Sequence, residues 1–361
     1  MERPLLRIYN PAGAYRDDIR APAELRATIH AHAPSWFEVG LQPGDYREEL
    51  LRVPGTRVQM SVAGEHLAGG TVASWALTGP ARPSTTIKVV DDRAVLERIL
   101  TAPQPSLPLA QQGDGAWAGN GPLESVLKTL VAANAPRAGV LLDIATDRGR
   151  GPNVTITGRW EPVSSVIDEH LRAAGLLATV TWQPATGRLV LDVHEPGTYH
   201  TRLSASDGTI QSWRIATSAP TATRAIVGND TGAAQQIIRS DTENEWHTAG
   251  EVWRAASTPA EAASQATAAL EEYGPKSGMA IQLAESPHVH YAGAHGMRVG
   301  QRVSLAVGDV TVTDVLEECE ITWTPGNPLV ASPRVGAWDD SPITSLSRAV
   351  ARIAKSVRRT R

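Results

Sequence analysis

The sequence predicts an α+β chain in which two mainly β parts flank an inserted α/β module and an amphipathic helix ends the chain. Short β-type runs separated by Gly, Pro, Asn or Asp fill both outer parts. The middle part has the order helix, strand, helix and hairpin, and the last residues carry apolar side chains at coiled-coil spacing. With 361 residues, including 31 Gly and 25 Pro, the chain has room for two or three turn-rich domains.

The first part, residues 1–114, is predicted to be a small β-barrel or β-sandwich. Its expected strands are LLRIYN, SWFEVGL, TRVQMSVAG, TVASWAL and STTIKVV. DDRAVLERIL then predicts a helix, because apolar residues recur at helical spacing and Asp91 or Asp92 can cap its start. A proline-rich link, TAPQPSLPLAQQGDG, ends this part.

The second part, residues 115–198, is predicted to be a compact α/β module. GPLESVLKTLVAAN and PVSSVIDEHLRAAG predict two amphipathic helices, with Pro122 near the first turn of one and Gly175 at the end of the other. VTITGRW is the expected strand between them, and ATVTWQPATGRLVLDVHEP reads as a hairpin. The apolar stripes are Leu123, Val126, Leu127, Leu130 and Val131 on the first helix and Val163, Val166, Ile167 and Leu171 on the second.

The third part, residues 199–335, returns to short strands with one helix. The expected strands are SWRIAT, RAIVGN, AAQQIIRS and QRVSLAVGDVTVTDVLEECEITW. TPAEAASQATAALEEYG predicts a helix with Thr258 as N-cap and Gly274 as its stop. No repeat of fixed period is visible, so the order β, α/β, β indicates an insertion between mainly β parts.

The composition argues against a disulfide-stabilised, exported, membrane-spanning or nucleic-acid-binding protein. Cys319 is the only cysteine, which is typical of a chain that folds in a reducing cytosol without disulfides. The N-terminus lacks an apolar core of signal-peptide length, and no window approaches ~18 uninterrupted apolar residues, so neither an export signal nor a membrane span is expected. A net charge of -4 argues against a dedicated nucleic-acid binder, which would need a basic face.

The sequence offers few candidates for catalysis. It has no GxSxG elbow and no HExxH motif, and DRGRGPN precedes a strand and lacks the lysine of a phosphate-binding loop. Neighbouring carboxylates should raise the pKa of the Cys319 thiol and blunt its reactivity. Adjacent acids such as Asp91 and Asp92 are expected to be solvated on exposed turns. We therefore expect no enzyme and no cofactor.

Two patterns keep other functions open. In SPHVHYAGAH, His288 and His290 would share one strand face and His295 could fold back toward them, so a metal site is conceivable beside a plainly polar strand face. Ten single Trp residues could form a stacking groove for sugars, although their separation favours core and interface anchors.

The C-terminal part, residues 336–361, is predicted to be a linker and a basic amphipathic helix. Ser341 and Pro342 suit a helix start, and no acidic residue follows them. The apolar seam has the three-four spacing of a coiled coil over about two heptads. Its residues are Ile343, Leu346, Val350, Ile353 and Val357, with a basic face of Arg348, Arg352, Lys355, Arg358 and Arg359. The narrow β-branched seam favours a protein partner over packing on its own domain, a membrane surface or nucleic acid.

The order of four segments resembles a family of siphophage tail proteins, often labelled minor tail proteins in phages of Actinobacteria, that occupy the baseplate hub at the tail tip. These segments are IKVVDDRAVLERILTAPQP, GPLESVLKTLVAANAPRA, GRWEPVSSVIDEHLRAAGLLATVTWQPATGRLVLDVHEP and RAIVGN. The resemblance covers residues 1–335 and extends to the hub proteins of contractile-tailed phages. It implies two tube-forming, barrel-like β domains and an α/β insertion.

The resemblance also implies a structural virion protein, a homotrimeric hub at the tail tip that is assembled in the host cytoplasm. The implied partners are the distal tail protein, tip or fibre proteins and the tape-measure protein, and DNA would only pass through the channel during genome ejection. An alternative is a tail protein that binds envelope carbohydrate or degrades the wall, supported by His288, His290 and the Trp residues. A DNA-binding component that uses the basic terminus is a third reading, and it predicts strong salt dependence.

Overall fold

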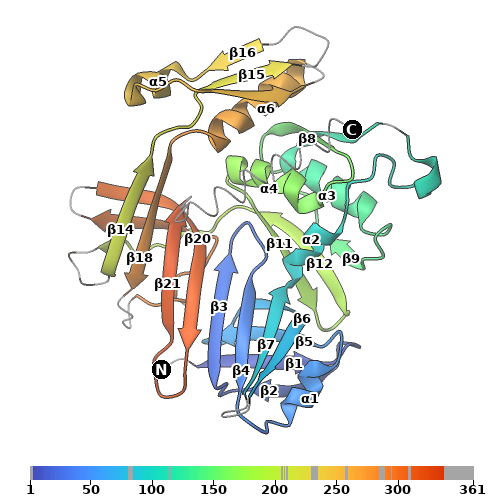
Figure 1. Cartoon of the computed structure of the whole chain (residues 1–361), viewed down its shortest axis with the longest axis vertical. Helices are drawn as coiled ribbons and strands as arrows, with labels where there is room; N and C mark the ends of the chain where they lie inside the picture. The colour runs from blue at the N-terminus through green and yellow to red at the C-terminus, as the bar shows by residue number, and fades with distance from the viewer. Residues whose placement is uncertain are drawn as a thin grey trace.

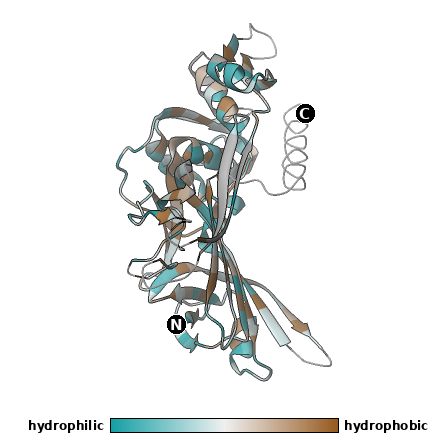
Figure 2. Cartoon of the chain, turned by 90° about the vertical axis from the view of Figure 1, so that its left-hand side faces the viewer, coloured by the Kyte–Doolittle hydropathy of each residue, from teal (hydrophilic) through white to brown (hydrophobic). Residues whose placement is uncertain are grey.

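The computed structural model describes residues 3–79, 84–113, 115–204, 206, 208, 210–228, 235–256, 259–283, 289–293, 295–307 and 310–336. These residues form an elongated molecule that is thin when viewed from the side (Figures 1 and 2). A large sheet occupies the lower and left-hand regions of Figure 1, the α/β module lies to its right, and a small α/β unit lies at the top.

Strands from both ends of the chain build the large sheet. The N-terminal strands are β1 (Pro4–Tyr9), β2 (Tyr15–Ile19), β3 (Glu24–His30), β4 (Trp36–Leu41), β5 (Arg57–Val62), β6 (Glu65–Thr78) and β7 (Ser84–Asp91), with helix α1 (Arg47–Arg52) after β4. The C-terminal strands are β13 (Leu203–Ser204), β14 (Ile210–Ser218), β18 (Lys276–Leu283), β19 (Arg302–Val307), β20 (Val310–Trp323) and β21 (Val330–Gly336). Buried and partly exposed positions alternate along β3, β4 and β5, as expected where one face of a sheet covers a core.

The two mainly β parts are joined directly by pairing between β3 and β20. These strands are antiparallel, with Leu25 opposite Trp323 and Ile29 opposite Cys319. Among the described strands the path runs β14-β18-β21-β20-β3-β4-β7-β6-β5-β1-β2, with β19 and β13 branching from β20. The path is open at both ends, so the expected barrel-like domains do not close into barrels among the described residues, although the mainly β character is confirmed. The cause is β20, which pairs with β3 as well as with strands of its own part.

One hydrophobic core serves the whole large sheet. Side chains from the N-terminal strands, such as Leu6 and Phe37, belong to the same buried cluster as Ile321 and Val335 from the C-terminal strands. Strand β6 bends through this sheet, since its first half pairs with β5 and its second half with β7. Gly70 lies where the pairing with β5 and the pairing with β7 overlap. A side chain on Gly70 would meet the Val90 carbonyl oxygen at 1.9 Å, so only glycine fits there.

The α/β module has its own core. Its elements are the short helices η1 (Asp92–Ala94), α2 (Val95–Arg98) and η2 (Leu109–Gln111), the strands β8 (Trp117–Pro122), β9 (Leu142–Ile144), β10 (Asn153–Gly158), β11 (Leu177–Gln183) and β12 (Arg188–His194), and the helices α3 (Leu123–Asn134) and α4 (Val163–Ala174). Every residue predicted for the two apolar stripes is buried, and the predicted hairpin is β11–β12. Gly175 ends α4 at φ 62°, as predicted, and the Asp91 carboxylate caps η1 by accepting from Arg93 N. The sequence did not predict β8 or β9.

The small α/β unit is an excursion between β14 and β18. It contains β15 (Arg224–Gly228), β16 (Gln235–Ile238), α5 (Ser240–Trp246), β17 (Glu251–Ala255) and α6 (Pro259–Glu272). The strand order is β16-β15-β17, and α6 packs on one face of that sheet. The predicted helix in this region is confirmed as α6, whereas its predicted cap Thr258 lies outside the described residues.

Candidate functional site

Charged contacts around η1, the helix that directly follows β7, hold the α/β module together and connect it to the large sheet. Arg93 Nη2 lies 2.6 Å from Asp168 Oδ1 on α4, and its Nε donates to the Ala178 carbonyl at 3.1 Å. The neighbouring acids Asp91 and Asp92 are not solvated, contrary to expectation. Asp91 is the partly buried helix cap, and Asp92 forms an ion pair with Arg57 in which both side chains are largely buried. Burial raises the pKa of Asp91 to about 7.

His32 connects three segments that are distant in sequence. Its Nδ1 lies 2.9 Å from Glu317 Oε2 on β20, and its Nε2 lies 3.0 Å from the Leu176 carbonyl in the module. Both partners are acceptors, so both contacts are hydrogen bonds only when both ring nitrogens carry a proton. The side chain is 3% exposed, which makes this contact a buried link between the β parts and the module.

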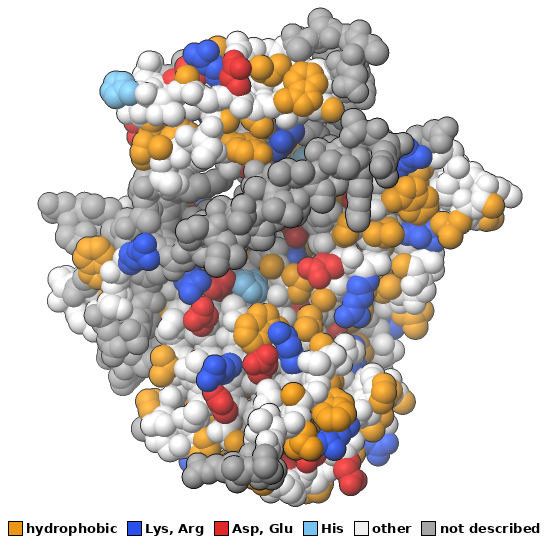
Figure 3. Space-filling model, viewed as in Figure 1, with side chains coloured by type: hydrophobic (Ala, Val, Ile, Leu, Met, Phe, Trp, Pro, Cys, Tyr) orange, Lys and Arg blue, Asp and Glu red, His pale blue; other side chains and the backbone are white. Residues whose placement is uncertain are grey.

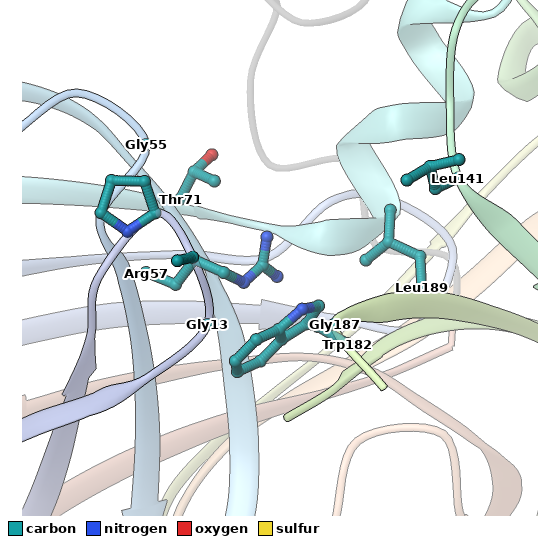
Figure 4. Close-up of a pocket in the computed structure, with 10 residues that line it drawn as sticks. Gly13, Gly55, Arg57, Thr71, Leu141, Trp182, Gly187 and Leu189 are labelled. Carbon is teal, nitrogen blue, oxygen red and sulfur yellow. The ribbon is translucent and has the colours of Figure 1, made fainter. Parts of the chain in front are cut away.

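A shallow cleft of about 340 Å³ lies between the first β part and the module (Figure 4). Its walls are Pro11, Ala12, Gly13, Gly55, Arg57 and Thr71 on one side and Leu141, Trp182, Gly187 and Leu189 on the other. The Arg57 guanidinium lies 4.6 Å from the centre of the Trp182 ring, and Tyr9 packs edge-on against the same ring at 5.0 Å. Both contacts occupy the indole, so Trp182 is a packing anchor here instead of a free platform for a sugar.

A second buried charge cluster lies within the module. Lys128 Nζ is 2.6 Å from Glu124 Oε1, 2.9 Å from the Thr146 carbonyl and 3.2 Å from Asp192 Oδ1. Glu124 Oε2 accepts from Arg150 N, which holds the DRGRGPN loop against α3. Burial raises the pKa of Glu124, but the bonds from Lys128 and the loop amides outweigh it and leave that pKa below its usual value. The cluster therefore acts as a structural brace for the loop.

The predicted reactive and metal-binding residues do not converge in the described structure. Cys319 is fully buried, and this burial raises the pKa of its thiol more than the adjacent carboxylates do. The sequence had suggested the carboxylates as the cause. His288 lies outside the described residues, His290 is half-buried and His295 is exposed. Glu65 accepts from Gly293 N and forms an ion pair with Arg298, which binds this segment to β6. Within the described ranges no three His, Cys, Asp or Glu side chains gather in a way that could hold a metal ion.

Surfaces suited to assembly are present at sheet edges and on exposed apolar side chains. In the described strand path β2 and β14 each have a neighbour on one side only. The second half of β6 pairs with β7 but not with β5, and it exposes Trp75 and Leu77 at 49% and 60%. Trp213 on β14 is 50% exposed. Unpaired backbone edges beside large apolar side chains are typical of sites where another chain binds.

The sequence signal for these edges was weak. TVASWAL reads as a strand, but the sequence alone does not reveal that only one side of it is paired. The predicted seam of Ile343, Leu346, Val350, Ile353 and Val357 and the basic face of Arg348, Arg352, Lys355, Arg358 and Arg359 lie outside the described residues. No helix in the described part of the chain has both the length and the hydrophobicity needed to cross a membrane.

Known structures share this fold. The chain is similar to the 43 kDa tail protein of prophage MuSo2 from Shewanella oneidensis, with a TM-score of 0.62 and 13% identity over 93% of this chain and 98% of that one. It is also similar to a tail protein from Neisseria meningitidis MC58, with a TM-score of 0.60 and 13% identity over 93% and 96% of the two chains. Prophage tail protein gp18 from Listeria monocytogenes EGD-e matches with a TM-score of 0.53 and 12% identity over 98% and 99%. The fold is thus that of phage tail proteins.

A family model gives the more specific assignment. The model described as Siphovirus ReqiPepy6 Gp37-like protein matches residues 5–337. The chain belongs to this siphovirus tail protein family, which confirms the resemblance noted in the sequence. No curated protein matches the chain.

Proposed function

We propose that this protein is the trimeric hub of a phage tail tip. In this role it joins the tail tube and distal tail protein to tip or fibre proteins, meets the tape-measure protein in the lumen, and forms part of the channel for genome delivery. The proposal includes no catalytic step and no cofactor. It places the chain in the virion after assembly in the host cytoplasm.

The observation that carries the proposal is the large open sheet. Its two ends, β2 and β14, have unpaired sides in the described structure, and the free half of β6 adds a third such edge. A heterologous contact between copies can close into a ring when an edge or face of one copy meets a different surface of the next. Exposed Trp75 and Trp213 would lose solvent contact at such an interface.

The division into residues 1–114, 115–198, 199–335 and 336–361 is part of this proposal. The separate hydrophobic cluster of the module supports the module as a unit, although Leu96 and Ile99 of the first part pack in it, whereas the first and third parts share one cluster in the large sheet. In the proposed assembly, the large sheets would build the ring wall and the module would lie beside the wall and contact partners.

Electron cryomicroscopy of the purified chain and of tails that contain it tests the proposal. We expect a three-fold ring at the distal end of the tube, with β2, β14 or the free half of β6 at the contacts between copies. Mass photometry of Trp75→Ser and Trp213→Ser variants should show fewer trimers, with Leu109→Ser as an exposed control outside the sheet edges. A chain that stays monomeric, or that occurs elsewhere in the virion, would contradict the hub. Released muropeptides or specific glycan binding would favour the alternative function.

A further inference from the structure

The small α/β unit has one covered and one open sheet face. On the covered face, Ala225, Val227, Ile237 and Val252 pack with α6. Strand register places Ile226 level with Gln236 and Trp253, and Arg224 level with Ile238 and Glu251. Because side chains alternate along a strand, these two rows point away from α6 and form the outer face.

The outer face carries one exposed or partly exposed apolar side chain on each of its three strands. Ile238 on β16 and Trp253 on β17 are 45% and 47% exposed, and Ile226 lies between them on β15. The strands are four or five residues long, so the face measures roughly 15 Å by 10 Å. Such a face, with a half-exposed Trp at one end, is well suited to receive a helix.

The unit around this face is acidic. Residues 219–275 contain eight acidic and three basic side chains. Each of the three basic residues is already paired with an acid, in the pairs Arg224–Glu243, Arg239–Glu271 and Arg254–Glu272. Asp241, Glu245 and Glu251 form no ion pair within the described ranges. At the top of Figure 3, acidic, basic and hydrophobic side chains lie close together. The complementary partner is an apolar stripe flanked by basic residues.

The chain contains such a segment, and the last described residue before it lies near this unit. The last described residue, Gly336, is level with Gly278 on the neighbouring strand β18, which starts at Lys276 just after α6 ends at Glu272. Residues 341–361 contain six basic residues and no acidic one. As a helix, the seam from Ile343 to Val357 would be about 21 Å long, enough to cross the face.

We propose that the outer face of the β16-β15-β17 sheet is the docking site for the C-terminal segment of the same chain. The seam residues cover the apolar patch formed by Ile238, Ile226 and Trp253. The flanking arginines and lysine lie near Glu245 and Glu251. This inference does not depend on the position of the protein in the virion.

Photo-crosslinking in the full-length protein tests the docking. A benzophenone amino acid replaces Val350 on the seam, and a control protein carries it at Arg352, off the seam. We expect the Val350 probe to crosslink to residues 224–256 at least fivefold more often than the Arg352 probe. Trp253→Ser with Ile238→Ser should reduce that yield at least fivefold, whereas Trp213→Ser, which is equally exposed on β14, should leave it unchanged.

A second variant and an isotope experiment keep the test decisive. Glu251→Lys reverses an exposed charge and removes the hydrogen bond from Gln236, and it should lower the yield at low salt more than at high salt. Mixed ¹⁵N-labelled and unlabelled chains should give crosslinks within one chain only. Crosslinks to another region, no effect of the Trp253→Ser and Ile238→Ser pair, or crosslinks between labelled and unlabelled chains would overturn the inference. A three-fold ring in any of these cases would leave the proposed hub intact.

Discussion

His32 Nδ1 lies 2.9 Å from Glu317 Oε2, although the two residues are 285 positions apart in the chain. The contact links the loop after β3 to β20, and the other ring nitrogen reaches the module at Leu176. The first β part, the second β part and the module therefore meet at His32, because this one side chain of the first part contacts an acceptor in each of the other two.

Removing the carboxylate of Glu317 should weaken this link. Glu317→Gln keeps the shape but loses a charge-assisted hydrogen bond to His32, so we expect a loss of about 1–3 kcal/mol in the free energy of unfolding. Chemical denaturation at constant pH measures it. Glu320→Gln is the control, because Glu320 is 50% exposed in its pair with Arg334 and should cost less than about 1 kcal/mol. Equal losses in the two variants would count against a special role for His32.

The Glu124–Lys128 pair predicts a larger effect. Lys128→Met leaves the fully buried Glu124 carboxylate with only the more distant Arg150 guanidinium, 3.9 Å away, so its charge is poorly compensated, which should cost about 3–5 kcal/mol. Adding Glu124→Gln to Lys128→Met should recover part of the loss, since the uncompensated charge is gone. Arg188→Met, at an exposed pair with Asp143, is the matched control. Denaturant midpoints of the four proteins decide the outcome, and a loss at Lys128 no larger than that at Arg188 would contradict the argument.

Gly70 is predicted to tolerate no side chain. In Gly70→Ala the new Cβ would lie 1.9 Å from the Val90 carbonyl oxygen, so β6 and β7 would have to separate. We expect a loss on the order of 3 kcal/mol or failure to fold. Gly79→Ala is the control, because no atom lies within 4 Å of its added Cβ. Thermal melting of both variants measures the difference, and similar melting temperatures would show that the strands can adjust.

Asp91 should make stability depend on pH. Its pKa is about 7 in the folded protein and 3.8 ordinarily, so between these values the folded state binds more protons than the unfolded state. Stability therefore falls as pH rises from about 4 to 7. Asp91→Asn keeps the cap acceptor without the charge, and the free energy of unfolding of the original protein relative to this variant should fall by roughly 2–4 kcal/mol across that range. Denaturation at several pH values measures it, and a constant difference would refute the raised pKa.

Much of the α/β module could be predicted because its signals are local. The burial of Leu123, Leu127 and Leu130 follows from helical spacing, and Gly175 follows from the conformation that ends a helix. The spacing of Glu124 and Lys128 is also visible in the sequence, but their burial is not, because it depends on Thr146 and Asp192 arriving from other elements.

The sequence by itself determined the order of β, α/β and β segments, the main helices, the hairpin of the module and the family. Only the tertiary structure decided that β3 pairs with β20, so that the two β parts share one open sheet and one core. It also decided which aromatic residues stay exposed, as Trp253 does and Trp182 does not. The physical reason is that helical and strand periodicity depends on neighbours in the chain, whereas strand pairing and solvent exposure depend on residues that only folding brings together.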